Sequence, residues 1–291
     1  MRIKKTFEDM GVGAVYGLAY ALSLAPMSFL YGIATLAFFL AYYIPGYRKA
    51  VVVQNVARCF PDKRYGEIIC IVKKFYSCFT AYFAEILKGI SAPAAVLDKR
   101  IVLENAELIS AHVQAGKNVI ACMGHCGNWE MLNFMPYKLG LRMYAVYKPL
   151  RSQAMNKLMI KVRARFGMKL IPDKQVARHI LSKGPLPAVY LFLADQCPSG
   201  GDERIRLELF GQPTYVISGM ERLARQSESA VVFLHVTLLA KGYYKVTCLP
   251  ICAQAQSTRE EEITRKYVAC LEDNIVAEPY GWLWTHKRWK K

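Results

Sequence analysis

The chain has 291 residues, of which 54% are hydrophobic, yet its formal net charge at pH 7 is +17. This length allows one large domain or two small ones. The combination of a high hydrophobic content with a high positive charge indicates a protein that binds an anionic membrane or acts on acidic substrates. Nucleic acid is the rival partner for so basic a chain. The sequence has no zinc-finger spacing, no RNP-like aromatic motif and no basic repeat, so we expect no nucleic-acid partner.

The nine cysteines are scattered along the chain. Two pairs lie close in sequence, Cys122 with Cys126 and Cys248 with Cys252, but neither has the C-x2-C spacing of a zinc site. We therefore expect no bound metal. Small buried hydrophobic residues in a reducing cytosol are the better interpretation of such a set.

An uncharged stretch, residues 11–44, follows the basic N-terminus. It is too long for the apolar part of a signal peptide and shows no persuasive cleavage site. Pro26 lies near its middle and should break or kink it, which leaves residues 28–44 as the better spanning half. We predict that residues 1–45 form a membrane anchor, either a helix or a helical hairpin, that spans the bilayer or lies in its interface. A hydrophobic hairpin buried in a soluble domain is the alternative.

Residues 46–291 are predicted to form one α/β domain. Helices are expected first over residues 47–59 and 65–90, the second with a wide apolar face at helical spacing. The later expected helices cover residues 102–115, 129–139, 153–165, 176–182, 217–225 and 259–277, and the expected strands cover 118–123, 142–147, 187–193, 230–239 and 243–250. Helices and strands alternate until the last two strands form a hairpin. This order predicts a mixed sheet flanked by helices.

Residues 118–130 carry the clearest sign of chemistry. An apolar run suits a buried strand, and glycines on both sides of the next histidine allow a sharp turn. Asn128 is a good N-cap for the following helix. His125 and Glu130 would meet across the turn, where the carboxylate orients the imidazole as a general base for a hydroxyl or amine. Nearby backbone N–H groups would bind a developing oxyanion. The alternative is a helix-capped turn with a core histidine.

The string Gly-His-Cys-Gly-Asn-Trp-Glu at residues 124–130 resembles the catalytic motif of the bacterial lipid A biosynthesis (lauroyl/myristoyl) acyltransferases, a branch of the H-x4-D/E lysophospholipid acyltransferases. Further motifs follow in the order of that family: Tyr147-Lys148-Pro149-Leu150, Arg163-Ala-Arg165-Phe-Gly167, Ala194-Asp195-Gln196, Phe210-Gly211-Gln212-Pro213 and the ending Trp282-Leu-Trp284-Thr-His286-Lys-Arg288-Trp289. The departures are small: Lys148 replaces the commoner arginine, and Cys126 stands where an aromatic residue is usual.

The resemblance implies that a fatty acyl chain moves from a thioester to a membrane lipid. The donor would be acyl carrier protein or acyl-CoA, and no cofactor or metal would be needed. The acceptor would be a lipid A precursor, with a lyso-lipid or aminolipid as the alternative. A cytosolic donor would place the catalytic domain on the cytoplasmic face of the cell inner membrane. An acyl-thioester hydrolase and a non-catalytic lipid-binding protein are the other function classes.

In this reading His125 is the general base and Glu130 its partner. Arg163 and Asp195 match family positions implicated in activity. Arg163 would bind a phosphate of the acceptor or of the carrier, and Asp195 would bind the acceptor or hold that arginine. A cationic rim is expected from Lys148, Arg151 and Arg165. A solvated helix face or a structural ion pair is the plainer interpretation of each.

Cys126 raises a second mechanism. A thiol next to His125 at a helix N-terminus is placed to act as a nucleophile that forms an acyl-enzyme. Neighbouring residues in a turn often point apart, so we expect direct transfer instead.

Overall fold

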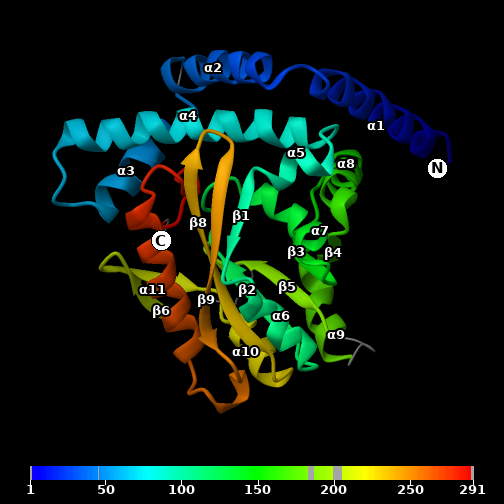
Figure 1. The fold of residues 1–291 in the computed structure, drawn as a ribbon. Coiled ribbons are helices and arrows are strands. Elements are labelled where there is room, and N and C mark those ends of the chain that lie inside the picture. Colours follow the sequence, from blue (N-terminus) through cyan, green and yellow to red (C-terminus); the bar gives the residue numbers. More distant parts are fainter. Residues whose placement is uncertain (1, 45, 183–186, 199–204, 290–291) are drawn as a thin grey trace.

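A computed structural model of the chain describes residues 2–44, 46–182, 187–198 and 205–289, with side chains from residue 13 onward. At its centre is a seven-stranded mixed sheet in the order β1-β9-β8-β2-β5-β3-β4 (Figure 1). Its strands are β1 (Ile101–Glu104), β2 (Val119–Met123), β3 (Met143–Tyr147), β4 (Lys169–Pro172), β5 (Val189–Leu193), β8 (Ala230–Ala240) and β9 (Tyr243–Cys252). The mixed α/β fold predicted from the sequence is confirmed.

Strand β2 lies in the middle of the sheet and is buried along its whole length. It pairs in parallel with β5 on one side and β8 on the other, and β5 pairs in parallel with β3. Only β9 and β1 run the other way, since β9 returns from β8 as a hairpin and β1 pairs in parallel with β9. The carboxyl ends of β2, β5 and β3 therefore meet at one edge of the sheet.

Helices cover both faces of this sheet. They are α3 (Lys49–Cys59), α4 (Tyr65–Gly89), α5 (Ala94–Asp98), α6 (Glu107–Gln114), α7 (Met135–Leu139), α8 (Gln153–Arg163), α9 (Val176–Leu181), α10 (Gly219–Gln226) and α11 (Glu262–Ala277). Alternate residues of β2 enter two separate cores: Ile120 and Cys122 face one, and Val119, Ala121 and Met123 face the other. A small antiparallel pair, β6 (Ile205–Leu209) and β7 (Gln212–Val216), lies outside the main sheet.

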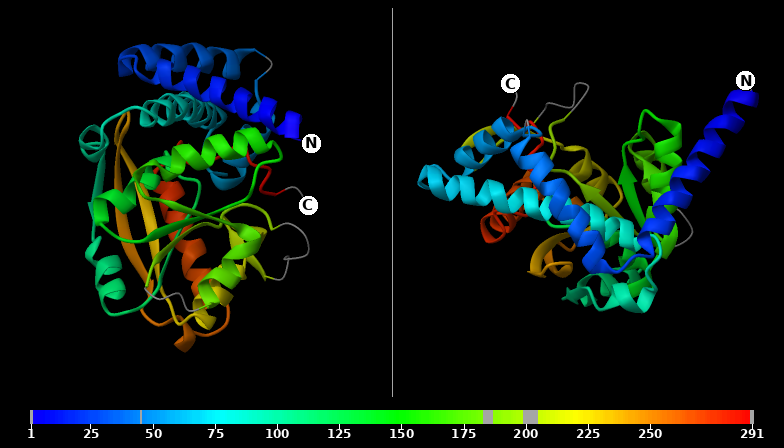
Figure 2. Two further views of the ribbon diagram at one scale, coloured as in Figure 1. Left: turned by 90° about the vertical axis from the view of Figure 1, so that its right-hand side faces the viewer. Right: turned by 90° about the horizontal axis from the view of Figure 1, so that it is seen from above.

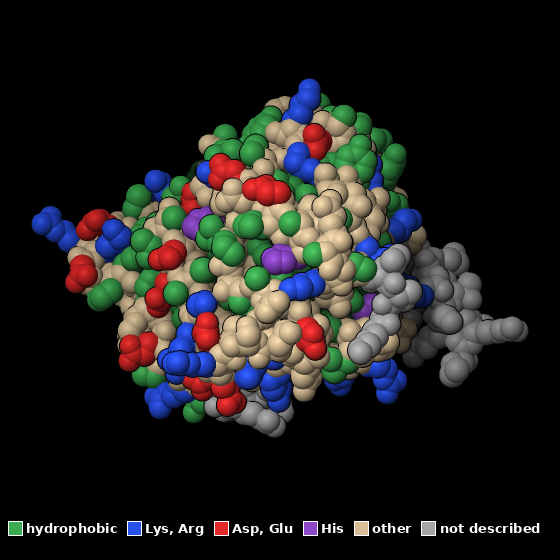
Figure 3. Space-filling model, turned by 60° about the horizontal axis from the view of Figure 1, so that its bottom comes forward, with side chains coloured by type: hydrophobic (Ala, Val, Ile, Leu, Met, Phe, Trp, Pro, Cys, Tyr) green, Lys and Arg blue, Asp and Glu red, His purple; other side chains and the backbone are tan. Residues whose placement is uncertain are grey.

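The N-terminal helices α1 (Arg2–Ser23) and α2 (Met27–Tyr43) lie on the outer side of α4, at one end of the sheet (Figures 1 and 2). Buried residues of α2 recur every fourth position, which places one face of the helix on the protein: Leu30, Ala34, Phe38 and Tyr42. Large apolar side chains on its other face are exposed, among them Phe29, Ile33, Leu36, Phe39 and Leu40. By contrast, the face shown in Figure 3, the lower side of Figure 1, mixes acidic and basic side chains with apolar ones.

The length and composition of α1 and α2 limit how they meet a membrane. Within the described part of the chain, no single helix is long and apolar enough to cross a bilayer. The segments Gly13–Ser23 and Met27–Tyr43 pass that test only as a pair, and they are bent by 114° at the break between them. The break covers residues 24–26 and ends at Pro26, the residue at which the sequence predicts it. Lys88 on α4 fixes it, because its Nζ donates to the carbonyl oxygens of Ser23 and Ala25 at 3.0 Å each.

Two helix predictions from the sequence are corrected. Residues 102–104 belong to strand β1, because they pair with β9, a partner that local sequence does not reveal; Asn105, at φ 55°, then separates the strand from α6. Residues 129–134 form a 3₁₀ helix, η1 (Trp129–Phe134), before the short α7. Strands β4, β6 and β7 were not predicted. The stretch at residues 198–202, which contains two glycines, lies outside the described residues from 199 onward.

Candidate active site

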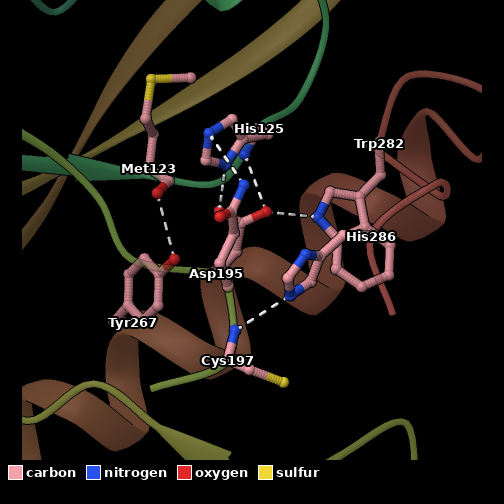
Figure 4. Close-up of polar contacts among 8 residues, drawn as sticks. Met123, His125, Asp195, Cys197, Tyr267, Trp282 and His286 are labelled. Carbon is pink, nitrogen blue, oxygen red and sulfur yellow. Dashed lines mark hydrogen bonds and ion pairs between the residues drawn. The ribbon is translucent and has the colours of Figure 1, made fainter. Parts of the chain in front are cut away.

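His125 and Asp195 form the centre of the site (Figure 4). His125 lies in the turn after β2, and Asp195 lies two residues past the end of β5, so both stand at the same sheet edge. The Nδ1 atom of His125 is 2.6 Å from Oδ1 of Asp195. Oδ2 of Asp195 accepts two more hydrogen bonds, from the backbone N–H of His125 at 3.0 Å and from the indole N–H of Trp282 at 2.7 Å. Asp195 thus holds both the ring and the backbone of His125.

The ionisation of Asp195 decides which nitrogen of the imidazole can act. Burial alone would raise the pKa of Asp195, but the His125 imidazole and the hydrogen bonds to the carboxylate outweigh it and lower the pKa to about 2. An ionised carboxylate only accepts hydrogen bonds, so the proton of the neutral imidazole resides on Nδ1. Nε2 then carries the lone pair. It lies 3.4 Å from the side-chain nitrogen of Gln196.

The turn that carries His125 is held by the C-terminal tail, residues 278–289. The carbonyl oxygen of His125 accepts a hydrogen bond from Leu283 N–H at 3.0 Å, and Gly127 N–H donates to the carbonyl oxygen of Gly281 at 2.9 Å. Gly127 has φ 57°, and a Cβ atom there would lie 2.7 Å from a methyl group of Val236. Only glycine fits this position without strain.

These bonds take three N–H groups of the turn out of the expected oxyanion hole. The N–H groups of His125, Cys126 and Gly127 already donate to Asp195 and to the carbonyl oxygens of Gly124 and Gly281. The turn is therefore tied down by its own N–H groups, which serve its geometry and are not directed at a substrate.

A pocket of about 490 Å³ opens beside the imidazole. Its apolar wall comes mainly from α8 and the ends of β3 and β5, and includes Leu150, Met155, Met159, Ile160, Leu191 and Leu193. Its polar lining includes His125, Gln196, Lys148, Glu130 and Arg163. Trp129 packs edge-on against the imidazole, with ring centroids 4.9 Å apart. The imidazole thus faces a space that suits an apolar chain and also carries positive charge.

Glu130 is paired with Arg163. The guanidinium donates through Nε to Oε2 of Glu130 at 2.9 Å and through Nη2 to Oε1, a two-point contact. Asn133 donates to Oε2 at 3.0 Å. The prediction that Glu130 orients His125 is therefore wrong in this structure, because Asp195 occupies Nδ1. Asp195 was predicted to bind the acceptor or to hold Arg163. In the structure it holds His125, and Arg163 is paired with Glu130.

A family model described as bacterial lipid A biosynthesis acyltransferase matches residues 5–291. The chain belongs to this family. A sequence comparison with curated proteins gives no match. Membership makes the chain an acyltransferase of lipid A biosynthesis type. The match covers the site, α2 and α1 from residue 5 onward.

The three cations of the predicted rim have different positions. Lys148 follows β3 and lines the pocket. Arg151 is exposed in the loop before α8 and is not part of the pocket lining. Arg165 donates to the carbonyl oxygen of Gly89 at 2.5 Å and so ties η2 (Ala164–Phe166) to the end of α4. The structure thus brings Lys148 and Arg163 to the site, and leaves Arg151 and Arg165 outside it.

Cys126 has the environment of a bystander, in line with the expectation of direct transfer, whereas Asn128 has a role different from the one the sequence indicates. Cys126 is buried, and burial raises the pKa of its thiol well above the ordinary value, with the charge of Asp195 adding to the effect. A thiolate nucleophile is therefore disfavoured. Asn128 does not cap the following helix; its side-chain amide donates to Glu85 of α4 at 2.8 Å. Within the described residues, no group of three or more His, Cys, Asp or Glu side chains is arranged to hold a metal ion.

Sequence reasoning did not assign roles to Trp282, Gln196 and His286. All three lie in motifs that resemble those of the family, so the sequence marked these positions but did not indicate what each side chain does. Trp282 donates to Asp195, and Gln196 faces Nε2 of His125. His286 accepts a hydrogen bond from the N–H of Cys197 at 3.1 Å and so fixes the segment that carries Asp195 (Figure 4). The C-terminal tail therefore holds Asp195 and the segment that carries it in place.

Proposed function

We propose that this protein transfers a fatty acyl chain from a thioester, carried by acyl carrier protein or coenzyme A, to a hydroxyl or amine of a membrane lipid such as a lipid A precursor. The observation that carries the proposal is the His125–Asp195 pair, whose Nε2 side opens on a pocket with apolar and cationic walls. A general base is all that the reaction needs beyond positioning, since a thioester carbonyl is already activated.

In the proposed step, Nε2 of His125 takes the proton of the acceptor hydroxyl or amine as the acceptor attacks the thioester carbon. A C–O or C–N bond forms, the C–S bond breaks, and the proton passes from the imidazolium to the leaving thiolate. Asp195 keeps the ring in the Nδ1–H tautomer and stabilises the imidazolium formed on the way. No acyl-enzyme is required, which agrees with the buried thiol of Cys126.

The two ends of the substrates differ in chemistry, and the pocket offers a place for each. The side chains of Met155, Met159 and Ile160 suit an acyl chain. Lys148 and Arg163 favour negative charge, either on the thioester oxygen in the transition state or on a phosphate of a substrate. Glu130 holds the guanidinium of Arg163 in place for this task.

We further propose that residues 1–45 dock the enzyme on the inner membrane, with residues 46–291 as the catalytic domain on its cytoplasmic face. The exposed apolar side chains of α2 support this location, because such a patch is costly in water. Lipid acceptor and acyl chain would then reach the pocket from the membrane. Helix α1 supports that route, since it lies on α8, which lines the pocket: Lys161 of α8 sits over the ring of Tyr16 at 3.7 Å.

The test is transfer of a labelled acyl group from a thioester donor, with and without lipid acceptor, by purified protein in detergent micelles. We expect labelled lipid in the wild type and a loss of about 10² to 10⁴ in turnover for His125→Ala. His112→Ala, on the remote helix α6, is the matched control and should keep full activity. Labelled free fatty acid without lipid product would instead indicate a hydrolase, and equal turnover in wild type and His125→Ala would refute the mechanism.

A further inference from the structure

A buried carboxylate lies behind the catalytic turn, outside the chemistry described so far. Glu85, near the C-terminal end of α4, is only 4% exposed. Its Oε2 accepts hydrogen bonds from the side-chain amide of Asn128 at 2.8 Å and from the hydroxyl of Tyr244 at 2.7 Å. Its Oε1 accepts one from the hydroxyl of Tyr31 at 3.1 Å. The three donors belong to the catalytic turn, to β9 and to the apolar helix α2.

Keeping a carboxylate at this position is costly. Burial raises the pKa of Glu85, and the hydrogen bonds from its three donors offset only part of that effect. Apolar side chains of similar volume commonly fill such a space at lower cost. Each of the four side chains lies on a different element, so their hydrogen bonds join four parts of the fold. We infer that this connection is the function of the buried carboxylate.

The part of the site that these hydrogen bonds affect most directly is the turn after β2, which carries His125. Asn128 lies three residues past His125, and the glycine between them has the left-handed conformation noted above. On the other side of the turn, the C-terminal tail holds the backbone of His125 and Gly127. The Asn128–Glu85 bond is the side-chain attachment of the same turn to α4. It holds Asn128, the residue directly before η1, against α4.

We propose that Glu85 is a positioning residue for His125, acting through Asn128, and that Tyr31 extends this link so that the seating of α2 on α4 is coupled to the geometry of the catalytic imidazole. The functional part of this inference rests on the proposed acyl transfer. The structural part, that changes at residues 31, 85 and 128 move the imidazole of His125, does not.

The Asn128–Glu85 hydrogen bond has a fixed donor and a fixed acceptor, and exchanging them provides a direct test. Asn128→Asp sets two carboxylates against each other, and we expect a loss of roughly tenfold or more in kcat, the scale of coupling between buried partners. Adding Glu85→Gln to this variant supplies an amide donor at position 85 for the new carboxylate, so we expect most of the activity to return. Glu85→Gln alone keeps an acceptor oxygen for Asn128, and the Tyr31 hydroxyl can turn to accept, so it should stay near wild type. Asn105→Asp, an exposed position, is the control.

The link to α2 is tested by Tyr31→Phe, which removes one hydroxyl and leaves the bonds of Asn128 and Tyr244. We expect a smaller drop in kcat, about two- to fivefold, the effect of one hydrogen bond to a charged group felt indirectly, with KM for the donor unchanged. Tyr43→Phe, on the exposed face of α2, should have no effect.

A readout that needs no activity separates this inference from the proposed function. In protein labelled with ¹⁵N-histidine, the ring signals of His125, identified by their loss in His125→Ala, should shift in Asn128→Asp and Tyr31→Phe and return toward wild type in the Glu85→Gln/Asn128→Asp pair. Shifted signals in a protein without acyl transfer would support the positioning role and reject the proposed function. Unchanged His125 signals in both Asn128→Asp and Tyr31→Phe would overturn the inference, whatever the activity shows.

Discussion

His125 Nδ1 and Asp195 Oδ1 lie 2.6 Å apart although 70 residues separate them in the chain. The adjacent parallel strands β2 and β5 cause this contact, because they deliver the residues that follow them to the same sheet edge. The carboxylate that orients the imidazole is thus Asp195. Glu130, five residues from His125, is directed instead at Arg163.

This arrangement predicts how the two carboxylates differ in kinetics. Asp195→Asn should lower turnover by about 10² to 10⁴, since it removes the charge that fixes the Nδ1–H tautomer and stabilises the imidazolium. Combining it with His125→Ala should add little further loss, because both changes remove one unit of function. Steady-state kcat of the single and double variants measures this. Fully multiplicative losses would mean that Asp195 acts apart from His125.

Glu130 should be coupled to Arg163 and not to His125. Glu130→Gln weakens the two-point ion pair, which is only partly exposed, with 10% of the Glu130 side chain and 24% of the Arg163 side chain accessible. We expect KM for an anionic acceptor or donor to rise several-fold, on the order of 1 kcal/mol in binding. In a double-mutant cycle, Glu130→Gln and Arg163→Ala should be non-additive. Additive effects of these two changes would contradict the pairing.

Cys126 should be a bystander. Its thiol is buried and its pKa is raised, mainly by burial, so it is a poor nucleophile at neutral pH. Cys126→Ser should keep most of the activity. Mass spectrometry of the intact protein mixed with the acyl donor alone provides the check: an added acyl mass that disappears in Cys126→Ser would establish an acyl-enzyme and reject direct transfer.

The lowered pKa of Asp195 predicts an acid-side loss of stability. The folded protein holds this carboxyl proton more weakly than the unfolded chain, because its pKa falls from the ordinary 3.8 to about 2. The ionised group therefore stabilises the fold above about pH 4, and this contribution is lost as the pH falls through about 2. Denaturant unfolding between pH 5 and pH 2 should show a steeper loss for the wild type than for Asp195→Asn. Parallel curves would rule out this contribution.

Membrane attachment should depend on the exposed face of α2. Removing residues 1–45 is a poor test, since it also uncovers the part of α4 that packs on Phe38 and Tyr42. Leu36→Glu with Phe39→Glu changes exposed positions only and should leave the fold intact. We expect the wild type to need detergent for extraction and the double variant to wash off partly in high salt. Release of the wild type by salt alone would show that these helices are not an anchor.

The sequence alone determined the elements whose signals are local. The break at Pro26, the long amphipathic α4, the buried strand before His125 and the hairpin of β8 and β9 were all predicted, because periodicity, proline and glycine act within a few residues. The motif around residues 124–130 and the ending Trp282–Trp289 were enough to indicate the family, which the family match confirms.

The tertiary structure decided which side chains meet. A short spacing in sequence favoured Glu130 as the partner of His125, whereas the order of strands in the sheet brought Asp195 there. From the local sequence, Asn128 was predicted to cap a helix, because capping is the usual role of asparagine at that position. Its side-chain amide instead donates to Glu85 of α4, 43 positions earlier in the chain. Strand β1 was missed for the same reason, since its pairing with β9 depends on a partner far along the chain. Hydrogen-bond partners over such distances are selected by strand order and helix packing, and no local pattern encodes them.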